Sequence, residues 1–189
     1  MRWALLFFAM TANAFGQVPP KRVATEDAER HLISAKPPTY PSFAQQTRIS
    51  GVVIVEISID TTGKTQIVRV ISGHPMLVDA ATRSVKSSLY RPFVENGNPT
   101  TVITAVMVTF GAVPSQIATA QKELGFQYAF WTTEGIAREA LAKGDAQGAG
   151  VQLKKAEELL ATVGLPGHRQ ERSQLDIDSS DLKKATERP

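Results

Sequence analysis

Residues 51–72, GVVIVEISIDTTGKTQIVRVIS, carry the strongest structural signal in this chain of 189 residues. In residues 51–59, alternating apolar residues lie on one side of the chain. The residues on the other side are apolar at first and become polar at Glu56 and Ser58. This alternation predicts a strand, and the apolar start of both sides is typical of a central strand. The tight-turn signal DTTG at residues 60–63 then leads into a return strand at residues 64–72. The two strands are expected to form an antiparallel hairpin.

Upstream of this hairpin, the segment KPPTYPSFAQQ at residues 36–46 places three prolines around Tyr40. Proline fixes φ, so the backbone is stiff and extended here until Pro41 opens a short helix over residues 41–48. The fixed φ of the prolines aims the chain into this helix. Before them, residues 15–35 are expected to form a polar linker that contains a short helix capped at Thr25 or a short strand through HLIS.

Downstream of the hairpin, apolar residues recur every four positions between residues 76 and 89 and predict a helix. The segment YRPFVENGNP is expected to be a rigid connection, and residues 100–110 alternate as a third strand. The helical crossover makes the third strand parallel to the second, so it can pair antiparallel with the first. The predicted fold class is α+β: a three-stranded antiparallel sheet in the order 2-1-3, with two helices on one face and the other face partly solvated.

After Pro114 the composition changes to Ala, Gln, Glu and Lys, which predicts helices over residues 115–143 and 145–162. This α-helical hairpin, residues 114–163, resembles a single tetratricopeptide unit. One such unit cannot bury its own apolar face, so the hairpin is expected to dock on the preceding domain or on another chain. Residues 164–189 hold few apolar residues and balanced charges, and they are expected to form a disordered tail.

At the N-terminus, Arg2 precedes an apolar run that ends in Ala12-Asn13-Ala14. The run is shorter than the ~20 residues that span a bilayer, and it suits a signal peptide over residues 1–14 with cleavage before Phe15. The alternative is a short membrane anchor that is not cleaved. The chain is therefore expected in the periplasm, and attached to the inner membrane if residues 1–14 are retained.

Composition and spacing exclude several functions. The chain has no cysteine, which rules out disulfides, thiolate metal sites and cysteine nucleophiles. Its net charge of +3 is spread along the sequence, so no basic stripe marks it as a nucleic-acid-binding protein. The GKT at residues 63–65 lacks the earlier glycine and the following helix of a phosphate loop. The three histidines, His31, His74 and His168, lie in separate segments without metal-ligand spacing. A non-enzymatic protein with no metal and no cofactor is expected.

The ordered set of motifs from residue 36 to residue 111 resembles the TonB C-terminal domain family. Each motif is weak alone, and the ordered set is specific. The set comprises Tyr40-Pro41, Gly51 ahead of the valine-rich strand, ID with Gly63 at the turn, VRVISG, the paired Ala80-Ala81, YRP at residues 90–92, NGNP at residues 96–99, and the last strand ending at Phe110. One departure is Ser88, which stands where the family usually has a tryptophan ahead of YRP.

The resemblance implies a transducer of energy-coupled transport across the outer membrane. Such domains bind a short peptide, the TonB box, of an outer-membrane transporter, which adds as a strand beside the last strand of the sheet and near the stiff segment before the first helix. Transferred to this chain, the implied partner-binding residues are Lys36, Pro37, Thr39, Thr101, Ile103, Ala105, Met107 and Thr109.

The expected partner is therefore a protein, either a TonB-box peptide or another envelope protein. The short apolar run and the roughly twenty residues that follow it argue against contact with inner-membrane motor subunits. A homodimer is left open. The alternative function is that of an exported periplasmic scaffold, which uses the same fold and its helical hairpin to hold another envelope protein without energy transduction.

Overall fold

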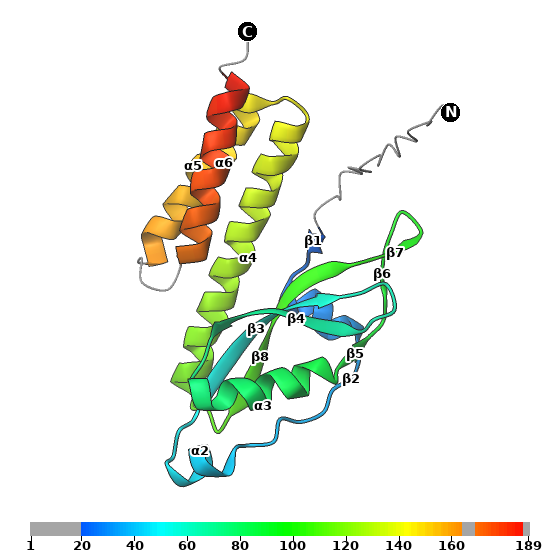
Figure 1. Ribbon diagram of the computed structural model, residues 1–189, viewed down its shortest axis with the longest axis vertical. Helices are drawn as coiled ribbons and strands as arrows, with labels where there is room; N and C mark the ends of the chain where they lie inside the picture. The colour runs from blue at the N-terminus through cyan, green and yellow to red at the C-terminus, as the bar shows by residue number, and fades with distance from the viewer. Residues whose placement is uncertain (1–19, 164–168, 187–189) are drawn as a thin grey trace, which may run out of the picture.

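A computed structural model describes residues 20–163 and 169–186 of the protein. It contains a twisted sheet with helices on both faces and a helical unit that extends away from the sheet (Figure 1). The expected signal peptide, residues 1–14, lies outside the described residues. In the described part of the chain, no helix combines the length and the apolar character that crossing a membrane would need.

The main sheet has four strands, in the order β1 (Lys21–Arg22), β8 (Val102–Phe110), β3 (Gly51–Ile59) and β4 (Thr65–Ser72). β3 pairs antiparallel with both β4 and β8. The expected sheet of three strands, in the order 2-1-3, was therefore incomplete. The additional strand β1 comes from the segment expected to be a linker, and it pairs in parallel with the outer side of β8.

Three helices cover the first face of the sheet: α1 (Thr25–His31), α2 (Ser42–Gln46) and α3 (Pro75–Lys86). The alternating side of β3 predicted to be apolar points into this layer, where it packs with Leu77 and Ala81 of α3 and Ala44 of α2. α3 begins at Pro75, with the His74 side chain accepting from the backbone of Met76. It ends earlier than expected because Leu89–Tyr90 forms strand β5, which pairs with β2 (Leu32–Ser34).

A second correction concerns the connection after α3. Residues expected to form a rigid link instead contain a hairpin of β6 (Phe93–Glu95) and β7 (Asn98–Thr100). Asn96 and Gly97 occupy its turn with φ of 50° and 82°. Two successive positive φ values match the twist of a two-residue hairpin turn, and Asn-Gly is the pair that tolerates them best.

The second face of the sheet had been expected to be partly solvated, and it is instead covered by α4 (Pro114–Ala142). Ile54 of β3 is 1% exposed and Ala105 of β8 is 4% exposed, and both pack in a cluster with Leu124, Phe130 and Trp131 of α4. The apolar start of this side of β3 therefore has an internal partner. α4 runs well past the sheet and carries α5 (Ala146–Val163) against its far half (Figure 1).

The expected disordered tail is wrong for residues 169–186, which form α6 (Arg169–Thr186) against α5 and α4. Leu175 of α6 is buried in the same cluster as the α4 residues. Glu171 and Asp178 are also buried, and each pairs with an arginine of another element. The composition of residues 164–189 indicated too little apolar surface for a folded segment. It could not show that acidic side chains of this segment are buried against arginines of other elements. We refer to α4, α5 and α6 together as the helical unit.

Candidate functional site

The outer edge of β8 is the site at which the resemblance places a partner. The carbonyl of Ile103 accepts the backbone N–H of Val23 at 2.9 Å, so this residue directs its backbone groups away from β3. Inward and outward groups alternate along an antiparallel strand. The odd-numbered residues, including Ala105, Met107 and Thr109, therefore present their N–H and C=O groups on the outer edge.

The first half of this edge is occupied by the chain itself. Lys21 and Arg22 lie opposite Val102 and Ile103 in parallel pairing. Just beyond them, the Thr25 hydroxyl donates to the carbonyl of Ala105 at 2.8 Å. We call residues 21–25 the N-terminal arm. Of the expected partner-binding residues, Ile103 thus already accepts from the extended part of the arm, and Ala105 accepts from the first side chain of α1.

The second half of the edge pairs with no strand in the described part of the chain. Met107 is half-buried and Thr109 is exposed. Among the backbone hydrogen bonds of the described residues, none outside the β3–β8 ladder reaches Met107 or Thr109. A strand that continued along β8 past the N-terminal arm would find unused donors and acceptors here.

The structure does not join Lys36, Pro37 and Thr39 to this edge by backbone hydrogen bonds. These residues are exposed, and the Lys36 carbonyl accepts the Ser84 hydroxyl of α3. In Figure 1 the segment runs beside α3 toward α2. It leads to Tyr40, whose hydroxyl donates to the carbonyl of Ile49 at 2.7 Å. The prolines therefore serve at least to aim the chain into α2.

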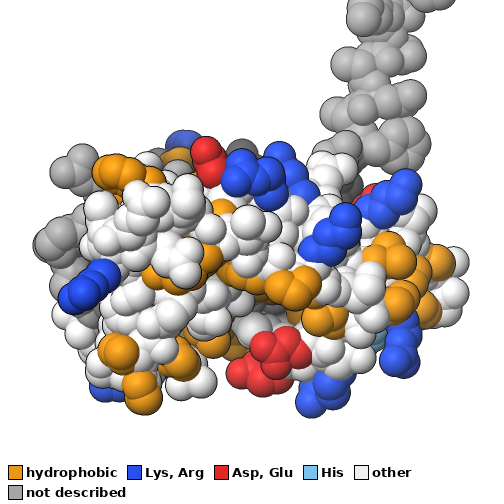
Figure 2. Space-filling view, turned by 90° about the horizontal axis from the view of Figure 1, so that it is seen from below, with side chains coloured by type: hydrophobic (Ala, Val, Ile, Leu, Met, Phe, Trp, Pro, Cys, Tyr) orange, Lys and Arg blue, Asp and Glu red, His pale blue; other side chains and the backbone are white. Residues whose placement is uncertain are grey.

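The end of the molecule that carries α2 and α3 shows no continuous patch of one chemical type. Figure 2 shows apolar side chains there among basic ones and a few acidic ones. Phe43 of α2 is the most exposed aromatic side chain among the described residues, at 60%. A scattered mixture of this kind is ordinary protein surface. The ordered array of backbone groups on β8 is therefore the better candidate.

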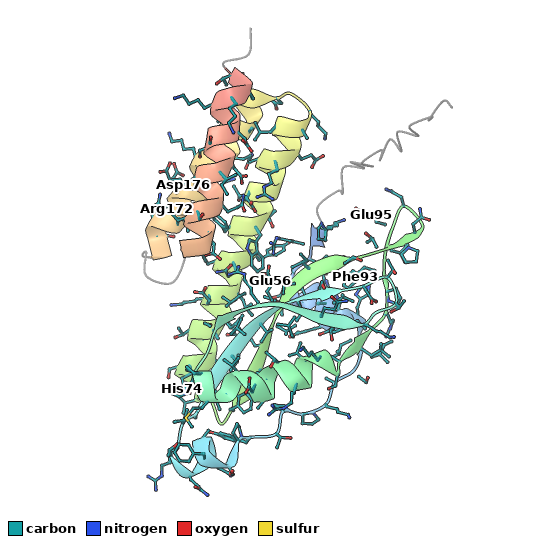
Figure 3. All side chains as sticks on the ribbon, in the orientation of Figure 1. Glu56, His74, Phe93, Glu95, Arg172 and Asp176 are labelled. Atoms are coloured by element: carbon teal, nitrogen blue, oxygen red, sulfur yellow. The ribbon has the colours of Figure 1, made fainter. Side chains whose placement is uncertain are left out.

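A buried ionic cluster lies between the sheet and the helical unit. Its centre is Glu56 of β3, which is 2% exposed and lies where the sheet meets the helical unit in Figure 3. One carboxylate oxygen of Glu56 pairs with Arg22 of the N-terminal arm, and the other accepts from Arg69 of β4 at 2.6 Å. Arg69 also reaches Glu171 of α6 at 2.9 Å.

Trp131 of α4 completes this cluster. The Arg22 guanidinium carbon lies 4.2 Å from the centre of the Trp131 ring, and that of Arg69 lies 5.6 Å from it. These are cation–π distances, and the interaction strengthens when the cation is desolvated. The N-terminal arm is thus anchored at Arg22 by an acid and an aromatic ring at once. Outside the cluster, Lys21 adds an exposed ion pair with Glu95 at 2.8 Å, which raises the pKa of Lys21.

Sequence reasoning missed the residues of this cluster. Arg22 stood in a presumed linker, Glu56 on a presumed solvated face, and Trp131 in a hairpin of unknown docking partner. One signal was present: Glu56 interrupts an otherwise apolar stretch in the middle of a strand. A charge in the middle of a central strand predicts a buried ion pair, because a lone charge there would be too costly.

A second group of buried charged side chains lies farther along the helical unit. Glu134 of α4 faces Arg138 on its own helix, at 2.7 Å, and Asp178 of α6. Burial, with the nearby negative charge of Asp178, raises the pKa of Glu134 to about 7, although Arg138 opposes this shift. A cavity of about 500 Å³ opens beside Arg138 and Asp178. Among residues 20–163 and 169–186, no group of three His, Cys, Asp or Glu side chains could hold a metal ion.

Comparisons with known proteins match the first part of the chain. Residues 36–111 match the family model described as the C-terminal region of the Gram-negative bacterial TonB protein. The protein TonB of Klebsiella pneumoniae is 30% identical over 96 residues, which are 51% of this chain and 39% of that protein. The chain therefore spans less than half of that relative. The resemblance to TonB C-terminal domains is confirmed for residues 36–111.

A solved structure is also similar in part. The solution structure of the TonB C-terminal domain of Pseudomonas aeruginosa matches 42% of this chain and 82% of its own length, with 23% sequence identity and a TM-score of 0.34. Neither the N-terminal arm nor the helical unit lies within residues 36–111.

Proposed function

We propose that residues 36–111, which match the TonB C-terminal family model, act as a domain of that type, and that the protein serves energy-coupled transport across the outer membrane. Its role is to bind a partner protein in the periplasm, without enzymatic activity. The partner strand adds to the outer edge of β8. A TonB-box peptide of an outer-membrane transporter is the partner that the family relationship favours.

The observation that carries this proposal is the pairing of β1 with β8. An extended segment from outside the TonB-like domain lies on the outer edge of β8 and makes backbone contact with it. An edge that accepts one strand in this way has the geometry for strand addition, in which main-chain hydrogen bonds supply affinity and alternating side chains supply specificity. The open groups of Met107 and Thr109 extend the same edge.

A photo-reactive residue at Thr109 tests the proposal. The full chain, carrying this residue in place of the exposed Thr109, is irradiated in living cells, and cross-linked proteins are identified by mass spectrometry. We expect an outer-membrane transporter to be captured. The same probe at exposed Thr132 of α4 is the matched control and should not capture it. Capture from both positions, or from Thr132 alone, would contradict binding at the β8 edge.

Proline substitution sharpens this test. The N–H of Met107 points outward, so Met107→Pro should leave folding intact and weaken partner binding by about 1 kcal/mol or more, since the partner's carbonyl loses its donor. The N–H of Val106 points toward β3, opposite Val55, so Val106→Pro should disrupt the sheet. Circular dichroism checks the folding of both variants. Unchanged capture by folded Met107→Pro would count against strand addition.

The alternative is a periplasmic scaffold that binds its partner through the helical unit. The observation that favours it is a set of apolar side chains on the outside of these helices, with Ile136 47%, Val151 61% and Ile177 53% exposed. The same cross-linking experiment separates the two functions. A probe at Val151 that captures an envelope protein, while Thr109 captures none, would favour the scaffold.

A further inference from the structure

We propose that the β8 edge selects a strand that carries an arginine, and that the N-terminal arm holds this site in a self-occupied state. The arginine of the incoming strand takes the place of Arg22 between Glu56 and Trp131. This inference rests on the proposed function, because it defines the chemistry of the strand that the β8 edge accepts.

The first step concerns the charge of Glu56. This carboxylate is almost completely buried, and its two oxygens are shared between Arg22 and Arg69. Arg69 is also shared with Glu171, so it does not neutralise Glu56 alone. When the N-terminal arm leaves the edge, one oxygen of Glu56 loses its cation. A buried charge without a partner is strongly unfavourable, so the site favours any strand that returns a cation to this position.

The second step distinguishes arginine from lysine. The guanidinium of Arg22 lies over the ring of Trp131 while it also reaches Glu56. A planar guanidinium can stack on an aromatic face and still donate from its edge, whereas an ammonium is a compact and strongly hydrated charge. The slot therefore favours arginine.

The third step gives the register of the strand. The backbone N–H that follows the arginine donates to the carbonyl of Ile103, as that of Val23 does in the N-terminal arm. In the arm the Thr25 hydroxyl reaches the carbonyl of Ala105 from the first turn of α1, and in a strand that stays extended the backbone N–H at this position takes over. Because β1 runs parallel to β8, a strand that continued in this register would pass along Met107 and Thr109.

The fourth step explains why the N-terminal arm can be displaced. β1 contains only two residues, and the contact with Ala105 is made by Thr25, which is already the first residue of α1. The arm therefore leaves the outward groups of Met107 and Thr109 unused. A partner strand that supplies the same arginine and continues along β8 gains these additional backbone hydrogen bonds. A longer strand with the same anchor should thus outcompete the arm.

A labelled peptide tests the inference on the full chain. The probe KRVATVTV keeps the sequence of residues 21–25 and continues as a strand, and KAVATVTV lacks its arginine. Fluorescence anisotropy measures the affinity of both peptides for the wild type and for Arg22→Ala, which weakens the arm. We expect KRVATVTV to bind Arg22→Ala at least about tenfold more tightly than KAVATVTV, because a hydrogen bond to a charged group is at stake. Its affinity for the wild type should be lower.

Two further variants protect the test against a folding defect. Thr25→Ala weakens the arm at its other anchor and should also admit KRVATVTV, so it replaces Arg22→Ala if that variant does not fold. In the Arg22→Ala background, Trp131→Leu should reduce the preference for the arginine peptide. A preference that persists unchanged in a folded Trp131→Leu variant would overturn the assignment of the slot.

The outcomes separate this inference from the proposed function. Equal binding of both peptides would overturn the selection of arginine and leave strand addition standing. Binding of neither peptide, with the Thr109 cross-link retained, would also overturn it. Loss of both the peptide binding and the Thr109 cross-link would reject the proposed function as well. A concentration-dependent dimer that disappears in Arg22→Ala would identify the arm of a second copy as the occupant and overturn a foreign strand.

Discussion

The two faces of the sheet are built from different chemistry. On the α3 face, the alternating side of β3 packs against aliphatic and small side chains of α1, α2 and α3. On the α4 face, apolar residues surround an ionic cluster, and all four buried carboxylates of the described residues, Glu56, Glu134, Glu171 and Asp178, lie on this side. Apolar contacts hold the TonB-like domain together, whereas directed ion pairs also join it to the N-terminal arm and the helical unit.

This difference shows what each face can do. Apolar packing is insensitive to the exact identity of a neighbour of the right size, so it suits a permanent core. A buried charge requires a particular partner in a particular place, and it penalises every arrangement that leaves it unpaired. The α4 face therefore specifies which segments lie against it, and this is the property that the proposed selection of an arginine-bearing strand requires.

The largest expected effect tests whether the α4 face is a true core. Phe130 is 1% exposed and packs between α4 and the sheet, so Phe130→Ala should reduce the free energy of unfolding by about 3–5 kcal/mol. Tyr128 lies on the same helix and is 39% exposed, and Tyr128→Ala should cost well under half as much. Urea denaturation monitored by circular dichroism measures both. Similar small losses would mean that the helical unit is only loosely attached.

A smaller effect is expected when the ionic cluster loses its central cation. Arg69→Leu leaves Glu56 and Glu171 each with one fewer partner, and it should reduce the free energy of unfolding by about 3 kcal/mol. This value is at the lower end for a broken buried pair because Arg69 is partly exposed. The matched control is Lys143→Ala, which breaks an exposed pair with Glu139 and should cost about 0.5 kcal/mol or less. A stabilised Arg69→Leu variant would show that the cluster does not favour folding.

The smallest expected effect is a dependence of stability on pH. The pKa of Glu134 is raised from 4.5 to about 7 in the folded protein, chiefly by burial. The folded state therefore holds this proton more tightly than the unfolded state does. This stabilisation is complete below pH 4.5 and is lost as the pH rises to 7. The difference between the two pKa values corresponds to about 3 kcal/mol, and solvent screening reduces the expected loss to about 2 kcal/mol. Arg138 and Asp178 face this carboxyl, and Arg22 contributes a weaker positive field.

Thermal unfolding between pH 4.5 and pH 7 measures how the stability depends on pH, and Glu134→Gln should make this dependence weaker. Glu139→Gln on the same helix is the control. The hydrogen bond from Lys143 and its charge lower the pKa of Glu139, so that group changes stability only as the pH falls below this range. If Glu134→Gln kept the slope of the wild type, the titrating group would be another one.

The α3 face could be predicted from the sequence because its signals are local. The alternation in β3, the Asp60–Gly63 turn and the four-residue spacing in α3 each reflect one element and its own geometry. The neighbours of β3 followed from chain connectivity. The Asn96-Gly97 hairpin was also encoded locally, but it was overlooked inside a segment rich in proline and polar residues.

The α4 face could not be predicted in the same way because its contacts are distant in sequence. Arg22 lies 34 residues before Glu56, and Glu171 lies 102 residues after Arg69. A two-residue strand such as β1 has no periodicity from which to infer a partner. The apolar residues Val52 and Ile54 indicated a covered face, yet nothing near them in sequence identified α4 as its cover.

The same limit applied to the candidate site. The last strand and the alternation of its edge residues were accessible from the sequence, and the resemblance indicated the edge itself. The arm that occupies the edge could not be predicted from the sequence, because Lys21 and Arg22 resemble any pair of solvated basic residues. The acidic residues of α6 likewise resembled a disordered tail until Arg69 and Arg138 supplied their partners.

The irregular pairing of β4 has a consequence for solubility. β4 forms the opposite margin of the sheet from β1, and its register against β3 shifts twice, between Ile54 and Val55 and between Glu56 and Ile57. Val68 and Val70 are exposed on this strand. Such shifts bend and twist a strand, so that its outer groups no longer form the even row that a neighbouring molecule would need for cross-β stacking. The β4 margin therefore resists the open-ended aggregation that a flat, valine-bearing margin would invite.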